Sequence, residues 1–241
     1  MIEQKLTIGM DRFIAKRWAD YAFDLRSSSV QAQNRYRQLQ EWLSQEIKGK
    51  EVVEKTASQL RRIWLTEDQY DTLRKHAVEI GSIQDVSTRT ILHFGLALNV
   101  FPFFRDLCAT VGRLTQLLGK CQGYEVRLRL LEKYQSKATV DYATRRGLLT
   151  LVNWGLLAEE AGYFTVNSLQ VTNSSYSVWF IQSLLQNQPA HCATLTDLVN
   201  FPESLGLTIP DLRSIVRENG NSLILERNGR NEEEVIYRTK V

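Results

Sequence analysis

The chain has 241 residues, with 30 Lys and Arg against 27 Asp and Glu and a formal net charge of +3 at pH 7. A hydrophobic content of 43% and a charged content of 24% are typical of a globular protein and exclude wholesale disorder. The mildly basic balance permits a polyanionic partner without requiring one. Three widely spaced cysteines, Cys108, Cys121 and Cys192, predict neither a disulfide framework nor a metal-ligand motif, so we expect a cytoplasmic protein.

The first half of the chain is predicted to be helical. Apolar residues recur at helical spacing over 8–25, 30–47 and 52–64. The sequence Thr66-Glu67-Asp68-Gln69 matches a capping box and predicts a helix up to residue 80, and Asp85 is expected to cap the next helix. Pro102 is expected at the start of a further helix that ends near residue 118.

The most apolar stretch is about 14 residues long and runs from Ile91 to Phe104. A bilayer span needs roughly 20 such residues, so we expect a pair of core helices here and no membrane partner. His93 is interpreted as a satisfied core residue of this pair.

The remaining chain predicts a recurring pattern of helices followed by short strands. A basic amphipathic helix over 124–134, a second helix over 140–153 capped by Thr139, and an alternating run over 163–166 are typical of the end of a winged helix. The C-terminal third predicts helices over 177–185, 195–200 capped by Thr194, 202–205, and 209–218 capped by Thr208. Strands over 222–227 and 235–238 then flank the hairpin signal Asn228-Gly229.

These elements predict a mainly α protein in which helix-turn-helix and winged-helix units surround a central helical core. We expect an N-terminal helix-turn-helix-like unit over 1–81, a central core with a winged-helix-like unit over 82–170, and a C-terminal winged helix-turn-helix over 171–241.

Two basic segments are candidate DNA-binding sites. Thr144, Arg145 and Arg146 lie toward the N-terminal end of the helix over 140–153, where a recognition helix meets the major groove. Ser58, Gln59, Arg61 and Arg62 are predicted to face a duplex in the same way. The windows 26–62 and 113–146 carry net charges of +4 and +5, which concentrates the positive charge around both segments. A merely solvated face, or a face that binds an acidic protein, remains the alternative.

The C-terminal unit is a weaker candidate. Arg213 and Arg217 lie four residues apart on its third predicted helix, and Arg230 lies in the hairpin turn. From residue 161 onward the net charge is −2, so docking of a protein is an equal alternative for this unit.

Catalysis finds little support in the sequence. No Gly-rich phosphate loop, metalloprotease motif or nucleophile elbow occurs, and the adjacent pair His191-Cys192 has the wrong spacing for a nucleophile and its base. We therefore expect no enzymatic activity, no cofactor and no metal.

The order of parts resembles a known family. The motifs ALNVFPFFRDL and ATRRGLLTLVNWGLL, within residues 10–166, are similar to those of BrxA-like proteins of bacterial BREX phage-defence systems. The resemblance implies a small, mostly helical, non-enzymatic DNA-binding protein that acts beside larger defence proteins, with contacts at Thr144, Arg145 and Arg146. We expect double-stranded DNA as the partner, together with larger defence proteins and a second copy of the chain in a homo-oligomer. The alternative function is an adaptor that uses its winged-helix modules to dock a larger protein.

Overall fold

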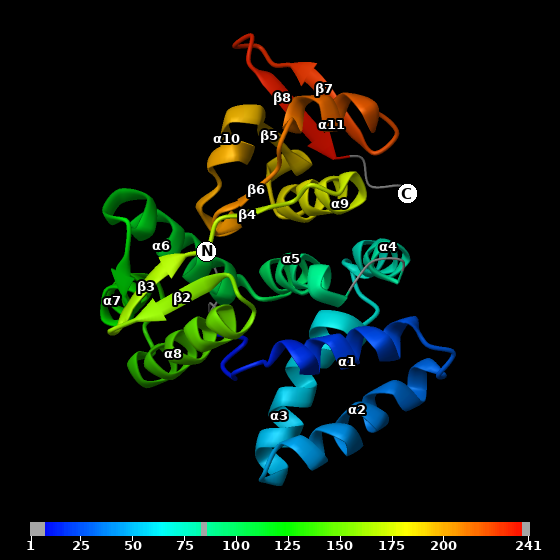
Figure 1. Cartoon of the computed structure of the whole chain (residues 1–241), viewed down its shortest axis with the longest axis vertical. Helices are drawn as coiled ribbons and strands as arrows, with labels where there is room; N and C mark the ends of the chain where they lie inside the picture. The colour runs from blue at the N-terminus through cyan, green and yellow to red at the C-terminus, as the bar shows by residue number, and fades with distance from the viewer. Residues whose placement is uncertain (1–7, 83–85, 238–241) are drawn as a thin grey trace, which may run out of the picture.

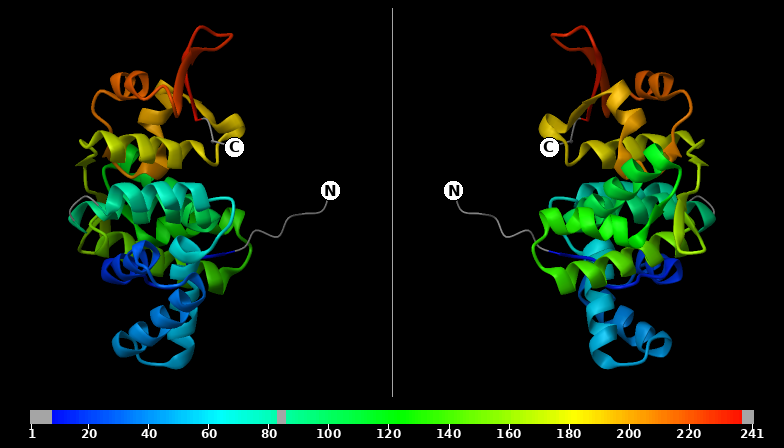
Figure 2. Two further views of the ribbon diagram at one scale, coloured as in Figure 1. Left: turned by 90° about the vertical axis from the view of Figure 1, so that its right-hand side faces the viewer. Right: turned by 90° about the vertical axis from the view of Figure 1, so that its left-hand side faces the viewer.

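The computed structural model describes residues 8–82 and 86–237 and shows a mainly helical protein with small sheets (Figure 1). The coarse fold class expected from the sequence is therefore confirmed. Helices α2 and α3 lie at one end of the molecule and the β7–β8 hairpin at the other, with the remaining helices between them (Figures 1 and 2).

The N-terminal part contains three α-helices and a closing π-turn. These are α1 (Lys16–Ser27), α2 (Ala32–Glu46), α3 (Lys50–Leu60) and η1 (Arg61–Leu65). The helix expected from residue 8 begins only at Lys16. Residues 8–15 form neither helix nor strand: Met10 takes a left-handed backbone conformation (φ 57°), which interrupts a helix, and the side chains of Met10 and Ile14 are buried in the core.

The capping box predicted at Thr66 is wrong. Helix α4 (Asp71–Gly81) begins five residues later, after a turn in which the Tyr70 N–H donates to the Asp68 carboxylate across 2.8 Å. Arg74 pairs with the same carboxylate, so Asp68 stabilises the turn rather than a helix start at Thr66. The cap predicted at Asp85 lies outside the described residues; the short 3-10 helix η2 (Val86–Arg89) follows it.

Helices α5 (Thr90–Val100) and α6 (Pro102–Leu118) form the centre of the fold and meet at a bend of 114°. Pro102 occupies the first turn of α6, as expected. In the described part of the chain, neither these two helices nor any other is by itself long and apolar enough to cross a bilayer.

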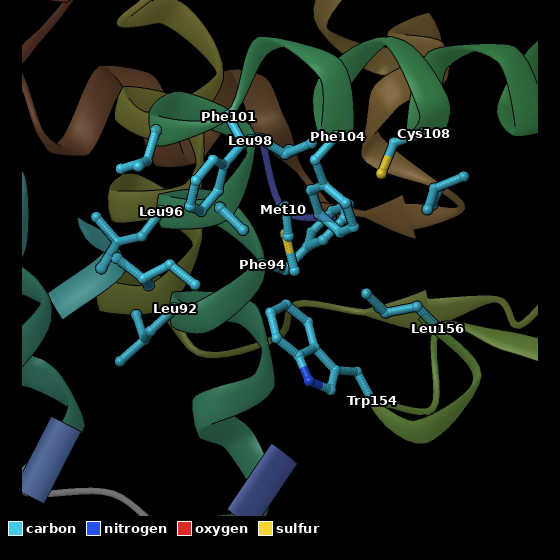
Figure 3. Close-up of a cluster of buried hydrophobic side chains, with 14 of the residues drawn as sticks. Met10, Leu92, Phe94, Leu96, Leu98, Phe101, Phe104, Cys108, Trp154 and Leu156 are labelled. Carbon is cyan, nitrogen blue, oxygen red and sulfur yellow. The ribbon is translucent and has the colours of Figure 1, made fainter. Parts of the chain in front are cut away.

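The core surrounds α5, which is buried on almost every side. Figure 3 shows Phe94 of α5 and Phe104 of α6 beside Met10 and Trp154, which come from distant parts of the chain. One continuous cluster of buried apolar side chains runs from Met10 to Tyr237. His93 is fully buried within it, which confirms its interpretation as a core residue.

Residues 102–166 contain a helix, a strand, two helices and two strands. After α6 come β1 (Cys121–Gln122), α7 (Gly123–Lys133), α8 (Lys137–Asn153), β2 (Leu157–Glu160) and β3 (Tyr163–Val166). The strands form an antiparallel sheet in the order β1-β3-β2. The cap predicted at Thr139 is wrong, because α8 begins at Lys137 and Thr139 lies inside it.

The C-terminal part repeats this order of elements. It contains β4 (Leu169–Gln170), α9 (Ser174–Leu185), η3 (Pro189–His191), β5 (Cys192–Thr194), α10 (Leu195–Asn200), η4 (Pro202–Ser204), β6 (Leu207–Thr208), α11 (Leu212–Glu218), β7 (Leu223–Arg227) and β8 (Glu233–Tyr237). Its sheet has the order β5-β8-β7, again with the first strand paired to the last, while β4 and β6 pair in parallel.

The local predictions for this part have mixed outcomes. Thr194 caps α10 by accepting the Asp197 N–H across 3.0 Å, as expected. Thr208 does not cap α11, because it pairs in β6 and α11 begins at Leu212. The hairpin is present, but its turn spans 228–232, and Asn231, rather than Gly229, takes the positive φ.

Candidate nucleic-acid interface

Helix α8 presents two arginines on its solvent side. Val140, Ala143 and Leu148 anchor the opposite side in the core. Arg145 is exposed and forms neither an ion pair nor a hydrogen bond within residues 8–82 and 86–237. Arg146 is half-buried, and its guanidinium carbon lies 5.0 Å from the centroid of the Tyr142 ring. Both cations therefore lack a carboxylate partner in the described structure.

The non-helical N-terminal segment holds α8 in place. The Ile14 N–H donates to the Thr150 hydroxyl across 2.9 Å, and the Lys16 N–H donates to the Asn153 side-chain oxygen across 2.8 Å. The Trp154 indole donates in turn to the Ile14 carbonyl across 2.9 Å. Three hydrogen bonds between segments more than 130 residues apart fix the orientation of this helix.

The second pair of arginines lies on the π-turn η1. Arg61 is exposed, with its guanidinium carbon 5.1 Å from the Tyr36 ring centroid. Arg62 lies 4.5 Å from the Phe101 ring centroid and donates to the Val100 carbonyl across 3.3 Å. Partial burial lowers the pKa of the Arg62 guanidinium, against the opposing charge of Asp68. Neither arginine forms an ion pair within the described residues.

A buried arginine stabilises the π-turn that carries these cations. Arg74 is completely buried and donates to the carbonyls of Ile63, Thr66 and Arg62 at 2.7, 2.8 and 2.6 Å. These carbonyls lie where the wider π-turn departs from the regular helical hydrogen-bond ladder. Arg74 therefore fixes the direction in which Arg61 and Arg62 leave the helix.

Two of the predicted DNA-binding side chains do not face solvent. Gln59 is 7% exposed and donates to Asp11, and Thr144 is 2% exposed with its hydroxyl unpartnered. The expectation that Gln59 and Thr144 face outward is corrected, because both lie on the core side of their helices. Ser58 is exposed, as predicted.

The C-terminal arginines differ from those of α8 and η1. Arg213 forms an ion pair with Glu233 of the adjacent hairpin. Arg217 and Arg230 are exposed, and neither forms an ion pair within the described residues. Acidic residues of the hairpin therefore neutralise part of the positive charge predicted for this face.

A cavity of about 420 Å³ lies beside α8. It is bordered by α7, α8 and the β2–β3 hairpin, and its lining includes Tyr124, Thr144, Arg145, Glu159 and Phe164.

No group of three or more His, Cys, Asp or Glu side chains converges to hold a metal in the part of the chain described.

Sequence reasoning missed one cation of this region. Arg12 belongs to the non-helical segment 8–15, and its Nη1 donates to the Tyr142 hydroxyl of α8 across 2.8 Å. The segment also passes the other arginine pair, because a Cβ placed on Gly9 would lie 3.5 Å from Arg62 Nη1. The segment that contains Gly9 and Arg12 thus lies between η1 and α8. The sequence predicted that Arg12 lies in a helix over 8–25, so nothing in it indicated a contact with Tyr142 of α8.

Comparison of the chain with family models, curated proteins and solved structures found no match.

Proposed function

We propose that the protein binds double-stranded DNA without catalysing a reaction on it. The observation that carries this proposal is the state of Arg61, Arg62, Arg145 and Arg146, none of which pairs with a carboxylate in the described structure. Three of the four rest on aromatic rings, which leaves their positive charge unneutralised. Such cations are available to displace counterions from a phosphate backbone.

The proposed reader of the duplex is a winged helix formed by residues 102–166. The order of α6, β1, α7, α8, β2 and β3, and the pairing β1-β3-β2, support this assignment. In this proposal α8 enters the major groove with Tyr142 and Arg145 leading, and the β2–β3 hairpin is the wing. Gln59 and Thr144, which are buried, take no part in the contact.

The biological setting we propose is a bacterial phage-defence system of the BREX type, with larger defence proteins as further partners. The motifs within residues 10–166 that resemble BrxA-like proteins are the support for this setting. Sequence preference is expected to be weak, because few Asn and Gln side chains of the kind that read adenine lie on the solvent side of α8.

The deciding experiment is a binding titration with a random 20-base-pair duplex at increasing salt. The wild-type protein should bind at low salt and lose affinity steeply as salt rises. The double variant Arg145→Glu, Arg146→Glu should lose most of this affinity. A matched control, Arg17→Glu with Lys75→Glu, makes the same change in charge at exposed positions on α1 and α4, outside both basic windows. Equal binding by both double variants would remove α8 from the interface.

A protein-docking adaptor is the second candidate. Leu117 and Leu118 at the end of α6 are 81% and 63% exposed, and Arg213 is neutralised by Glu233, which together favour a protein contact over a nucleic-acid contact at these places. This candidate predicts no duplex binding at about 100 mM salt, where phosphate contacts still contribute. Co-purification of a stable complex with a larger protein, without DNA, would favour it.

A further inference from the structure

Two arginines that are more than 130 residues apart in the sequence both lie near the ring of Tyr142. The guanidinium carbons of Arg12 and Arg146 are 5.2 and 5.0 Å from the centroid of its ring. Arg146 follows Tyr142 by one helical turn of α8, whereas Arg12 reaches the ring from the non-helical N-terminal segment. Two cations therefore share one aromatic side chain.

The position of Arg12 is fixed by its surroundings. Its Nη1 donates to the Tyr142 hydroxyl across 2.8 Å, and only 17% of its side chain is exposed. Two residues further on, the Ile14 N–H donates to the Thr150 hydroxyl of α8. An arginine held in this way loses little conformational entropy when it binds an anion.

No carboxylate neutralises the pair fully. Asp11 approaches Arg12 Nε only to 4.0 Å, and it already accepts a hydrogen bond from Gln59. Arg12 Nε is buried without a hydrogen-bond partner, and the described residues provide no acceptor for Arg146. Two like charges on one ring repel each other, and an anion placed against both would convert this repulsion into attraction.

We propose that Arg12 and Arg146 together bind a single phosphate of the DNA backbone at the edge of the Tyr142 ring, where the Tyr142 hydroxyl holds Arg12 in place. This inference rests on the proposed function and adds to it a phosphate site that sets the register of α8 on the duplex. Guanidinium groups suit this task because their N–H donors match the oxygens of a phosphate. The site also makes the N-terminal segment part of the DNA interface.

The salt dependence of duplex binding tests this stoichiometry. If both arginines hold one phosphate, the double variant Arg12→Gln, Arg146→Gln should reduce the slope of log K against log salt by about 0.9, the value for one contact on B-DNA. Whichever arginine is replaced first, replacing the other in that variant should cost less affinity than replacing it in the wild-type protein. The control double variant Arg17→Gln, Lys75→Gln, at exposed positions outside both basic windows, should leave the slope unchanged. Arg146→Gln alone supplies the test if Arg12→Gln lowers the melting temperature.

Two results would overturn the shared site while leaving DNA binding intact. One is a double variant Arg12→Gln, Arg146→Gln whose slope of log K against log salt falls by about 1.8 and whose loss of affinity equals the sum of the two single losses. This result would indicate two separate phosphates. The other is an Arg12→Gln variant whose affinity for the duplex equals that of the control variant Arg17→Gln.

If the wild-type protein binds no duplex at 50 mM NaCl, the proposed function fails and a second probe decides the site. Inorganic phosphate is then titrated while the arginine Nε–H resonances are followed by NMR. The phosphate site would be supported by saturable shifts of the Arg12 and Arg146 resonances, provided that substitution of either arginine by Gln abolishes the shift of the other. Unchanged resonances would overturn it.

Discussion

The indole N–H of Trp64 donates to Nδ1 of His93 across 3.1 Å, and Nε2 of the same ring lies 2.9 Å from the carboxylate of Asp20. Because an indole is only a donor, Nδ1 must be unprotonated, and the neutral ring carries its proton on Nε2. His93 thus links η1, α5 and α1 through one buried ring. Burial lowers the pKa of His93, although the hydrogen bond and charge of Asp20 act in the opposite direction.

Stability should therefore fall when the solution is acidified through the ordinary range of histidine. Below the unfolded pKa of about 6.5, the unfolded state binds a proton that the folded state resists, so unfolding becomes more favourable. We expect a loss on the order of 1 kcal/mol between pH 7.5 and 5.5 in urea denaturation. His93→Gln should flatten this dependence, and an equally steep profile in that variant would assign it to other groups.

Asp20 should act only at lower pH. Burial raises its pKa, but the hydrogen bond from His93 and the hydrogen bond and charge of Lys16 outweigh this and lower it below the ordinary value. The stability that Asp20 contributes is present above its unfolded pKa of about 4 and is lost as pH falls through the lower folded value. The interval from pH 7.5 to 5.5 therefore separates His93 from Asp20.

Replacement of Arg74 by Met should destabilise the protein by about 3–5 kcal/mol, because three carbonyls and the Asp68 carboxylate would lose their donor. Lys75→Met is the matched control. Lys75 is 68% exposed and pairs with Asp71 at the surface, so its loss should cost less than about 1 kcal/mol. The free energies of unfolding in urea compare the two, and similar values would show that Arg74 is not essential to the π-turn.

Periodicity in the sequence predicted most helices because it reports which side of each helix is buried. It failed at residues 8–15, where Met10 and Ile14 have helical spacing but belong to a non-helical segment in which the Ile14 N–H donates to Thr150 of α8. Hydrophobic spacing cannot distinguish these cases, since hydrogen-bond partners such as Thr150 are more than 130 residues away. The phosphate site proposed at Arg12 was hidden from sequence reasoning for the same reason.

Cap predictions depended on competition among nearby polar groups. Thr194 caps α10 because its hydroxyl meets the Asp197 N–H. At Thr66 no helix begins, because Asp68 instead accepts a hydrogen bond from the Tyr70 N–H and forms an ion pair with the buried Arg74. Of the predicted interface residues, Arg61, Arg62 and Arg145 are exposed and Arg146 is half-buried. Gln59 and Thr144 are buried, because the sequence pattern did not resolve which of two neighbouring polar residues faces the core.

Substitution of Gly112 by Ala should separate α6 from the C-terminal part of the chain. A Cβ at this position would lie 1.9 Å from the Pro202 carbonyl oxygen, and backbone on both sides prevents an easy adjustment. We expect a loss of about 3 kcal/mol or more from overpacking. Gly220→Ala is the matched control, because its nearest neighbour would lie 3.9 Å away. Equal urea midpoints for the two variants would show that this contact contributes little to stability.

Two threonines of α8 provide a final test with opposite expected signs. Thr144→Val removes a buried hydroxyl that has no partner, so stability should rise by about 1 kcal/mol. Thr150→Val removes the acceptor of the Ile14 N–H and should lower stability by about 1–3 kcal/mol. Thr144→Val should also bind duplex DNA like the wild-type protein, since the side chain is buried. A weakened affinity in a Thr144→Val protein of unchanged stability would instead restore Thr144 as a contact residue, as the motif over 143–157 predicts.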